Sequence, residues 1–272
     1  MKQAKVFVLL IATCSLAAVA GEHVDVIHDA HIHYNNDVWQ RLPPARALSM
    51  LKNENINRAL VFATPGEGAE LLYRVDAELV VPFLQPYKSW RHRYVWHKDP
   101  ELKSYLLEQL QRIPYRGFGE FHVNGQDAEA KPIADMIAIA RERKMALHIH
   151  ADLEAMQILL NKTADLVVIW AHGGFDIPLE TLQTLFEKYP GLHTELSFRE
   201  GMLDYAQQLT PQWKAFLINN RTRILVGADT YLASRWAELS DLTAESRHWL
   251  KQLPDEVAAD IARNNLDRLF PK

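Results

Sequence analysis

Residues 24–34 read VDVIHDAHIHY, an apolar run that ends in regularly spaced polar side chains. The run begins with β-branched residues, which is typical of a β-strand. Asp29, His31 and His33 then follow at intervals of two. Because side chains alternate along a strand, all three are expected on one face at its end. Two imidazoles placed in this way can bind one divalent metal, although a lone His-x-His motif is weak evidence.

The segment before this strand has the pattern of a secretory signal peptide. Lys2 and Lys5 form a basic start, residues 6–17 are apolar, and small residues follow. Such a run is too short for a transmembrane helix and has the wrong flanks. We therefore predict a signal peptide over residues 1–20, cleavage after Ala20, export to the periplasm and no membrane insertion after cleavage.

Residues 21–272 are predicted to form one domain without disulfides. Cys14 is the only cysteine and lies in the predicted leader, where Thr13 disfavours lipoprotein processing. About 250 residues can bury a sufficient core as one domain. Any metal must then be bound by histidine and carboxylate side chains. The formal net charge of −4, without a basic stripe, argues against nucleic acid or an anionic membrane as the partner.

Short apolar runs alternate with stretches of helical periodicity along the whole of this domain. The predicted strands are residues 24–34, 58–64, 79–85, 115–123, 145–152, 166–173, 192–199 and 223–230. Near-continuous apolar strands are typical of parallel sheets buried on both faces. Strict alternation at this length predicts the α/β class and a single (β/α)8 TIM barrel. A doubly wound open sheet is the alternative, but no Gly-rich phosphate loop follows the first strand.

Metal-binding side-chain types stand at or near the end of five of these runs. The candidates are His31, His33, Glu120, His150, His172 and Asp229. Each alone has an ordinary interpretation as a hydrogen-bonded core residue or a helix cap. In a barrel, however, the strand ends converge at one mouth. Buried imidazoles and carboxylates gathered there would repel one another or stay desolvated without a cation, so the sequence predicts a metal site.

These ordered motifs resemble the amidohydrolase superfamily, and within it the branch called amidohydrolase family 2. The matching segments are Asp29-Ala-His31-Ile-His33, Gly117-Phe-Gly119-Glu120, His148-Ile-His150, Ala171-His172-Gly173-Gly174, Gly227-Ala-Asp229 and the closing IARNNLDRLF of residues 261–270. The resemblance covers the whole predicted domain. Its motifs are specific for the superfamily and not for the substrate.

The resemblance implies a role for each candidate. His31 and His33 would bind the more buried metal together with Asp229, which would also take the proton from the metal-bound water. His172 would bind a second metal or hydrogen-bond the attacking hydroxide. Glu120 would bridge two metals, a position more often filled by a carbamylated lysine. Zinc is the leading choice, one or two ions per chain, with manganese, iron or nickel as alternatives.

Further choices concern the fifth strand and the substrate. His150 is preferred as a metal ligand over His148, because it lies nearer the strand end; His148 would support it or pack inward. The candidates for substrate contact are His122, Arg199, Lys88 and Arg91. An ion pair on the rim is an equally good interpretation of Arg199. Residues 87–97 are rich in aromatic and basic side chains and indicate either a lid over the mouth or a helix-packing loop.

The expected function is metal-dependent hydrolysis of an amide, ester, lactone or related bond of a small molecule. Lys88 and Arg91 suggest an anionic substrate. A metal-dependent decarboxylase of an aromatic or muconate-type acid is the alternative that this branch also contains. A non-catalytic periplasmic metal- or ligand-binding barrel is a further alternative, against which the intact Asp229 argues. The substrate, the number of metals and a homo-oligomeric state are left open.

Overall fold

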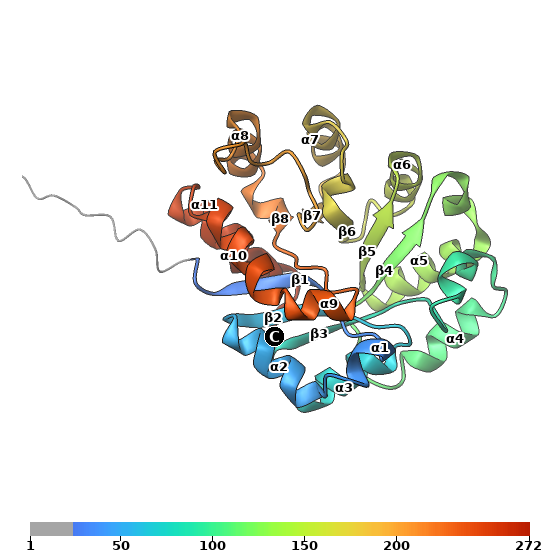
Figure 1. Cartoon of the computed structure of the whole chain (residues 1–272). Coiled ribbons are helices and arrows are strands. Elements are labelled where there is room, and N and C mark those ends of the chain that lie inside the picture. Colours follow the sequence, from blue (N-terminus) through green and yellow to red (C-terminus); the bar gives the residue numbers. More distant parts are fainter. Residues whose placement is uncertain (1–23) are drawn as a thin grey trace, which may run out of the picture.

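Eight parallel strands, hydrogen-bonded in chain order, form the centre of the computed structural model, which describes residues 24–272 (Figure 1). They are β1 (Ile27–His33), β2 (Ile56–Phe62), β3 (Val80–Leu84), β4 (Gly117–Val123), β5 (Ala146–Ala151), β6 (Val168–Trp170), β7 (Leu192–Glu195) and β8 (Ile224–Leu225). The ring closes where the Ala30 N–H donates to the Val226 carbonyl at 2.7 Å. The predicted (β/α)8 barrel and its eight strands are therefore confirmed. The predicted signal peptide lies outside the described residues.

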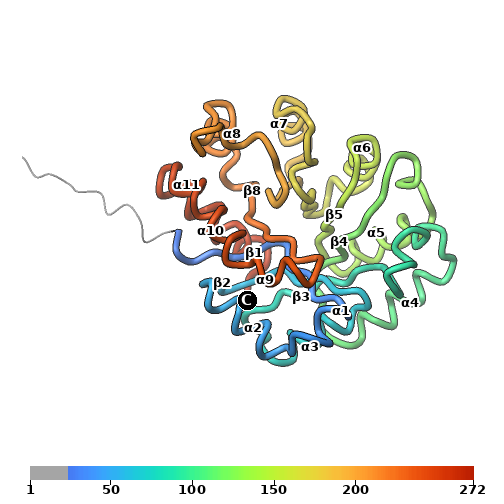
Figure 2. Tube along the Cα trace, in the orientation of Figure 1, coloured from blue at the N-terminus to red at the C-terminus, as the bar shows by residue number. Residues whose placement is uncertain are grey.

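Helices connect successive strands and cover the outside of the ring (Figures 1 and 2). They are α1 (Asn36–Trp39), α2 (Pro44–Asn53), α3 (Glu67–Val75), α4 (Leu102–Gln109), α5 (Lys131–Arg143), α6 (Leu153–Lys162), α7 (Leu179–Lys188), α8 (Pro211–Asn219), α9 (Ala233–Ala237), α10 (Leu239–Leu250), α11 (Asp255–Ala259) and α12 (Asn265–Leu269). Local signals fix several starts, since the Asp152 side chain caps α6 and the Thr210 hydroxyl caps α8. Within residues 24–272 no helix has the length and apolar character needed to cross a membrane.

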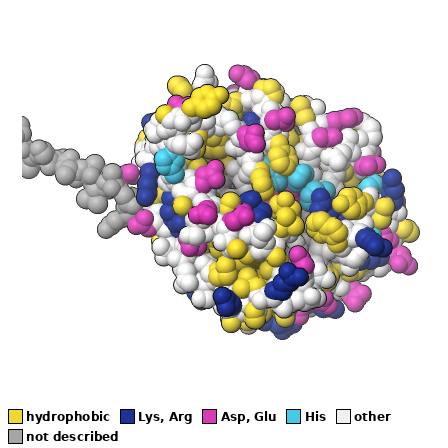
Figure 3. Space-filling view, viewed as in Figure 1, with side chains coloured by type: hydrophobic (Ala, Val, Ile, Leu, Met, Phe, Trp, Pro, Cys, Tyr) yellow, Lys and Arg dark blue, Asp and Glu magenta, His cyan; other side chains and the backbone are white. Residues whose placement is uncertain are grey.

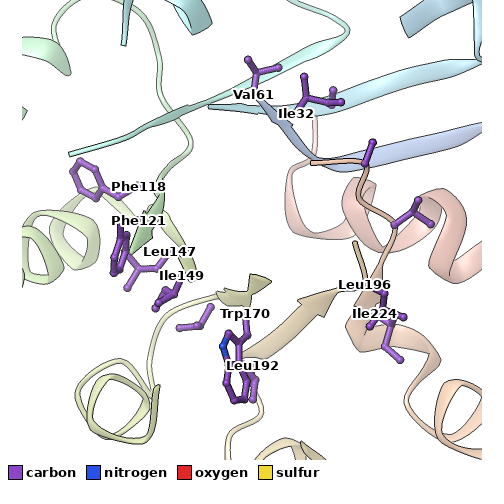
Figure 4. Close-up of a cluster of buried hydrophobic side chains, with 14 of the residues drawn as sticks. Ile32, Val61, Phe118, Phe121, Leu147, Ile149, Trp170, Leu192, Leu196 and Ile224 are labelled. Atoms are coloured by element: carbon purple, nitrogen blue, oxygen red, sulfur yellow. The ribbon is translucent and has the colours of Figure 1, made fainter. Parts of the chain in front are cut away.

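Two apolar layers hold the barrel together. The outer layer lies between strands and helices, and Figure 4 labels ten of its side chains: Ile32, Val61, Phe118, Phe121, Leu147, Ile149, Trp170, Leu192, Leu196 and Ile224. The inner cluster includes Ala30, Leu60, Phe62, Val81, Phe83, Ala146, Ile169 and Leu225. Because side chains alternate along a strand, neighbours such as Val61 and Phe62 belong to different layers.

The C-terminal segment closes the end of the barrel where the strands begin. Phe270 packs against the inner cluster. Arg58, which is buried on β2, donates to Asp267 Oδ1 and to the Phe270 carbonyl, both at 2.6 Å. Asn265 Nδ2 donates to the Ile224 carbonyl at 2.6 Å. Polar side chains of the chain terminus are thus tied to the first residues of the strands.

Arg58→Ala should lower the free energy of unfolding by about 2–3 kcal/mol, because it leaves a buried carbonyl group and Asp267 without their donor. Chemical denaturation measures this change. Lys131→Ala is the control, since it removes only an exposed pair with Asp135 on α5 and should leave the midpoint unchanged. Equal stability of the two variants would contradict the anchoring role of Arg58.

Candidate metal centre and active site

The structure brings all six predicted metal-site residues together at the mouth formed by the strand ends. His31 and His33 end β1, Glu120 and His150 lie on β4 and β5, His172 lies in the short helix η4 (Ala171–Gly174) after β6, and Asp229 follows β8. All are buried except His150, which is partly exposed. The Asp229 N–H donates to the His31 carbonyl at 2.7 Å and so ties the two ends of the ring at the site.

Four of their atoms form a first donor set: His31 Nε2, His33 Nε2, Glu120 Oε2 and Asp229 Oδ1. The two nitrogens are 3.0 Å apart. Glu120 Oε2 lies 3.5 and 3.3 Å from them, and Asp229 Oδ1 lies 3.5 and 3.4 Å from them. Neighbouring ligand atoms of a zinc ion with bonds of about 2.0–2.1 Å are about 3.3 Å apart, which is close to these five distances. Asp229 Oδ1 is buried without a hydrogen-bond partner among the described residues, so the set fits a divalent cation.

The other oxygen of Glu120 faces a second donor set. Glu120 Oε1 lies 2.8 Å from His150 Nδ1 and 3.6 Å from His172 Nε2. Asp229 Oδ2 lies 4.0 Å from the same nitrogen of His172. Glu120 therefore stands between two groups of ligand atoms, which is the position that a bridging carboxylate needs. Within residues 24–272 the cavity at this mouth has no lysine in its lining that could take this place.

Glu120 depends on a close approach of two strands. Gly119, which precedes it, has a φ of 137°, and a Cβ there would lie 2.3 Å from the His148 carbonyl oxygen. Only glycine can adopt this backbone conformation at a position that has no room for a side chain. The Gly-x-Gly-Glu pattern of β4 thus has a steric reason, which is to turn the Glu120 side chain toward the mouth.

Glu195, at the end of β7, is the residue of this site that the sequence patterns above do not single out. It is fully buried, and its Oε1 lies 3.0 Å from His31 Nδ1 and accepts the His172 N–H at 2.7 Å. Its Oε2 accepts the Ser197 N–H at 2.8 Å. A proton held on His31 Nδ1 leaves the Nε2 lone pair directed at the first donor set. A charged residue inside a predicted buried strand is the signal that points to Glu195.

Carboxylates and imidazoles in the cluster stabilise each other's charged forms. Burial acts to raise the pKa of Glu195, but the neighbouring His31 holds it far below its usual range. Burial likewise opposes a charge on His31, yet the surrounding carboxylates, Asp229 first, raise its pKa well above the ordinary value. The pKa of Glu120 lies well below its usual range for the same reason, because nearby imidazoles outweigh burial. Ionised carboxylates at this depth require positive charge, which protons or a divalent cation can supply.

His148 lies one layer deeper than His150 on β5. Its ring is 4.7 Å from the rings of His31 and Phe62, measured between centroids. Neither ring nitrogen has a partner within the described part of the chain, and burial lowers its pKa well below the ordinary value. His148 is therefore a neutral, inward-packed side chain, whereas His150 reaches the mouth.

Asp29 does not share a face with the two histidines of β1, so that expectation was wrong. Its Oδ1 accepts the His31 N–H at 2.8 Å and the Ala228 N–H at 3.2 Å. The pairing of β1 with β2 shifts register between Asp29 and Ile32. This local hydrogen bond breaks the strict alternation and turns the carboxyl group to the seam between β8 and β1.

A cavity of about 300 Å³ opens above the two donor sets, which suits a small molecule. It is lined by His33, Asn35, Thr64, Gln85, Tyr87, Trp90, Arg93, Glu120, His122, His150, His172, Phe175, Phe198, Asp229 and Tyr231. Figure 3 shows histidine side chains on this face among hydrophobic and basic ones.

His122, one of the predicted substrate contacts, lines this cavity. Burial lowers its pKa to about 3, so the ring is neutral. The Tyr87 hydroxyl accepts the His122 N–H at 2.6 Å and lies 2.9 Å from Nδ1 of the ring. The phenol can donate its own proton to Nδ1, which leaves a donor at Nε2, 3.8 Å from Glu120 Oε2.

The three other predicted substrate contacts lie outside the cavity lining, and this expectation is corrected. Lys88 Nζ pairs with Asp99 Oδ2 at 2.6 Å, and Arg91 is exposed. The Arg199 guanidinium donates to two backbone carbonyl groups. Arg93 lines the cavity instead. Residue spacing in an irregular segment does not show which basic side chain turns inward.

Glu195→Gln should weaken the binding of Zn²⁺ by about 10–100-fold, because the neutral amide holds the proton on His31 Nδ1 less strongly and its NH2 group cannot replace the second accepting oxygen. Competition with a chromogenic chelator measures the affinity. Glu200→Gln, on the exposed segment after β7, is the matched control and should bind zinc like the wild type. An unchanged affinity of Glu195→Gln would contradict the orienting role.

No protein-family model matches the sequence, and no curated protein matches it. Solved structures do. An amidohydrolase from Burkholderia multivorans with bound zinc superposes with a TM-score of 0.57 at 13% identity, over 90% of this chain and 98% of that one. A probable 2-pyrone-4,6-dicarboxylic acid hydrolase from Acinetobacter baumannii gives 0.60 at 12%, over 90% and 99%. A TatD homologue from Escherichia coli gives 0.63 at 14%, over 92% and 99%. The chain therefore has the (β/α)8 barrel fold of these amidohydrolase-type structures.

Proposed function

We propose that the protein is a metal-dependent hydrolase that attacks an amide, ester, lactone or related bond of a small molecule with metal-activated water. The observation that carries this proposal is the first donor set, in which two imidazole nitrogens lie 3.0 Å apart and each lies within 3.5 Å of a Glu120 oxygen and an Asp229 oxygen, below a cavity. The structural neighbours support it, since one of them holds zinc and another is named as a 2-pyrone-4,6-dicarboxylic acid hydrolase.

A divalent cation held by these donors would polarise a substrate carbonyl group and supply a hydroxide nucleophile at neutral pH. Imidazole and carboxylate ligands at these distances favour zinc. The place of Glu120 between the two donor sets favours two cations per chain. A single cation, together with CO₂ release from an aromatic acid, would favour the decarboxylase alternative.

His172 is poised to act through its Nε2 atom. Its Nδ1 lies 3.0 Å from the Ser197 carbonyl oxygen and 2.9 Å from Ser197 Oγ. A carbonyl oxygen can only accept, so Nδ1 carries a proton and the Nε2 lone pair faces Glu120. This tautomer suits a ligand of the second cation better than a donor to a hydroxide.

Asp229 is placed to move the proton. Its Oδ1 belongs to the first donor set, and the side chain also lines the cavity. A carboxylate at this position can accept a proton from the attacking water and return it to the leaving group. The φ of 49° at Asp229 is unusual for a residue other than glycine, and such backbone is concentrated at functional sites.

Asp229→Asn should lower kcat by about 10²–10⁴-fold on a substrate found in a panel of esters, lactones and amides, because the amide cannot take the proton. Steady-state kinetics and circular dichroism together separate this loss from unfolding. Asp241→Asn, exposed on α10, should keep the activity. An Asp229→Asn variant as active as the wild type would exclude the proposed proton transfer.

Removal of the metal should abolish hydrolysis, and zinc should restore it, because the donor set alone supplies no nucleophile. Dialysis against a chelator followed by stepwise addition of Zn²⁺ tests this. Full activity of protein shown to be free of metal would refute the metal-dependent mechanism.

A further inference from the structure

Arg93 is the one lysine or arginine in the lining of the mouth cavity within residues 24–272. The carbon of its guanidinium lies 4.7 Å from the centroid of the Trp90 ring and 5.5 Å from that of Tyr94. Inside the described part of the chain it has no carboxylate partner and no hydrogen bond. By contrast, Arg141 pairs with Asp165 at 2.5 Å. Stacking on aromatic faces leaves the N–H edge of a guanidinium available to a ligand.

Three other polar side chains of the cavity wall are already hydrogen-bonded within the protein. The Thr64 hydroxyl donates to Gln85 Oε1 at 2.6 Å, and Gln85 Nε2 donates to the Glu120 carbonyl at 2.9 Å. Asn35 Oδ1 accepts the Thr64 N–H at 2.9 Å. With Asn35, Thr64 and Gln85 already hydrogen-bonded, Arg93 is the lysine or arginine that the described part of the wall can offer to a ligand.

Two phenylalanines form an apolar part of the lining beside the second donor set. The rings of Phe175 and Phe198 lie 4.4 and 5.6 Å from the ring of His172, measured between centroids. Both residues have positive φ values, 58° and 56°, and both side chains are more than a third exposed. A positive φ is unfavourable for a bulky residue, and strained backbone of this kind is concentrated at ligand sites. Exposed rings held in this way can receive a flat apolar group.

We propose that the substrate is a small carboxylate with a planar ring, and that it binds through two contacts. Arg93 binds the carboxylate with the forked N–H edge of its guanidinium. Phe175 and Phe198 contact the ring and hold it beside the donor sets. This inference rests on the proposed function, because the bound carboxylate is a substrate only if the protein is a hydrolase. The binding itself can be measured separately.

Two fluorinated probes of one shape, 4-fluorobenzoate and 4-fluorobenzamide, test the anion contact by fluorine NMR on the zinc-loaded protein. The wild type should bind the benzoate at least about tenfold more tightly than the benzamide, as a charge-assisted contact does. In Arg93→Met the two Kd values should become similar, through loss of benzoate affinity. Arg91→Met, two residues earlier on the same segment and exposed, is the matched control and should keep the wild-type ratio.

Phe198→Ala tests the ring contact. It should weaken both probes by a similar factor and leave the ratio of their Kd values unchanged, because the ring is common to both. Circular dichroism and zinc content should match the wild type in all variants.

Other outcomes overturn the proposal. A wild type that binds neither probe, or both equally, excludes the anion contact. An Arg93→Met variant with the wild-type ratio shows that the metal, and not Arg93, selects the benzoate. Unchanged affinities in Phe198→Ala exclude the ring contact. If the probes behave as expected but no bond is hydrolysed, the proposed function fails while the anion contact stands.

Discussion

Buried negative charge at the barrel mouth is the constraint on which the rest of this structure depends. Glu120 on β4, Glu195 on β7 and Asp229 after β8 reach the same small volume, and each is nearly inaccessible to water. Imidazoles stand between them, and Glu120 and Glu195 each belong to a group of histidine and glutamate atoms that could hold a metal ion. Carboxylates at this depth are stable only when they face positive charge, so the metal site and the fold around it support each other.

The two ends of the barrel have different roles: one holds the fold together, and the other carries the candidate active site. At the end where the strands begin, Arg58 ties β2 to the C-terminal segment, and Phe270 fills the interior. At the opposite end, polar side chains replace apolar ones, and the backbone adopts positive φ values at His172 and Asp229. Barrels generally place catalytic groups at this second end, because the loops there can vary while the closed ring stays rigid.

The sequence predicts the barrel and the six convergent residues because both depend on local regularities. Apolar runs mark the strands, and strand ends in a barrel must meet. Glu195 is not recognised in this way, since its partners come from β1 and from η4, far away in sequence. Asp29 departs from alternation through a hydrogen bond to His31 that no periodicity reveals.

Residues 87–97 show the same limit more sharply. Its composition indicates a basic, aromatic wall, but Lys88 and Arg93 are told apart only by their partners. Asp99 neutralises Lys88, whereas aromatic rings alone hold Arg93. Which basic side chain faces the cavity depends on tertiary contacts, because residue spacing in an irregular segment does not indicate where a side chain points.

If the mouth of the barrel binds catalytic metal, the protein should carry that metal through purification. Protein purified without added metal or chelator is analysed by plasma mass spectrometry. We expect bound divalent metal, about two equivalents per chain if Glu120 bridges as proposed. No bound metal, and no uptake when zinc or manganese is added, would contradict it.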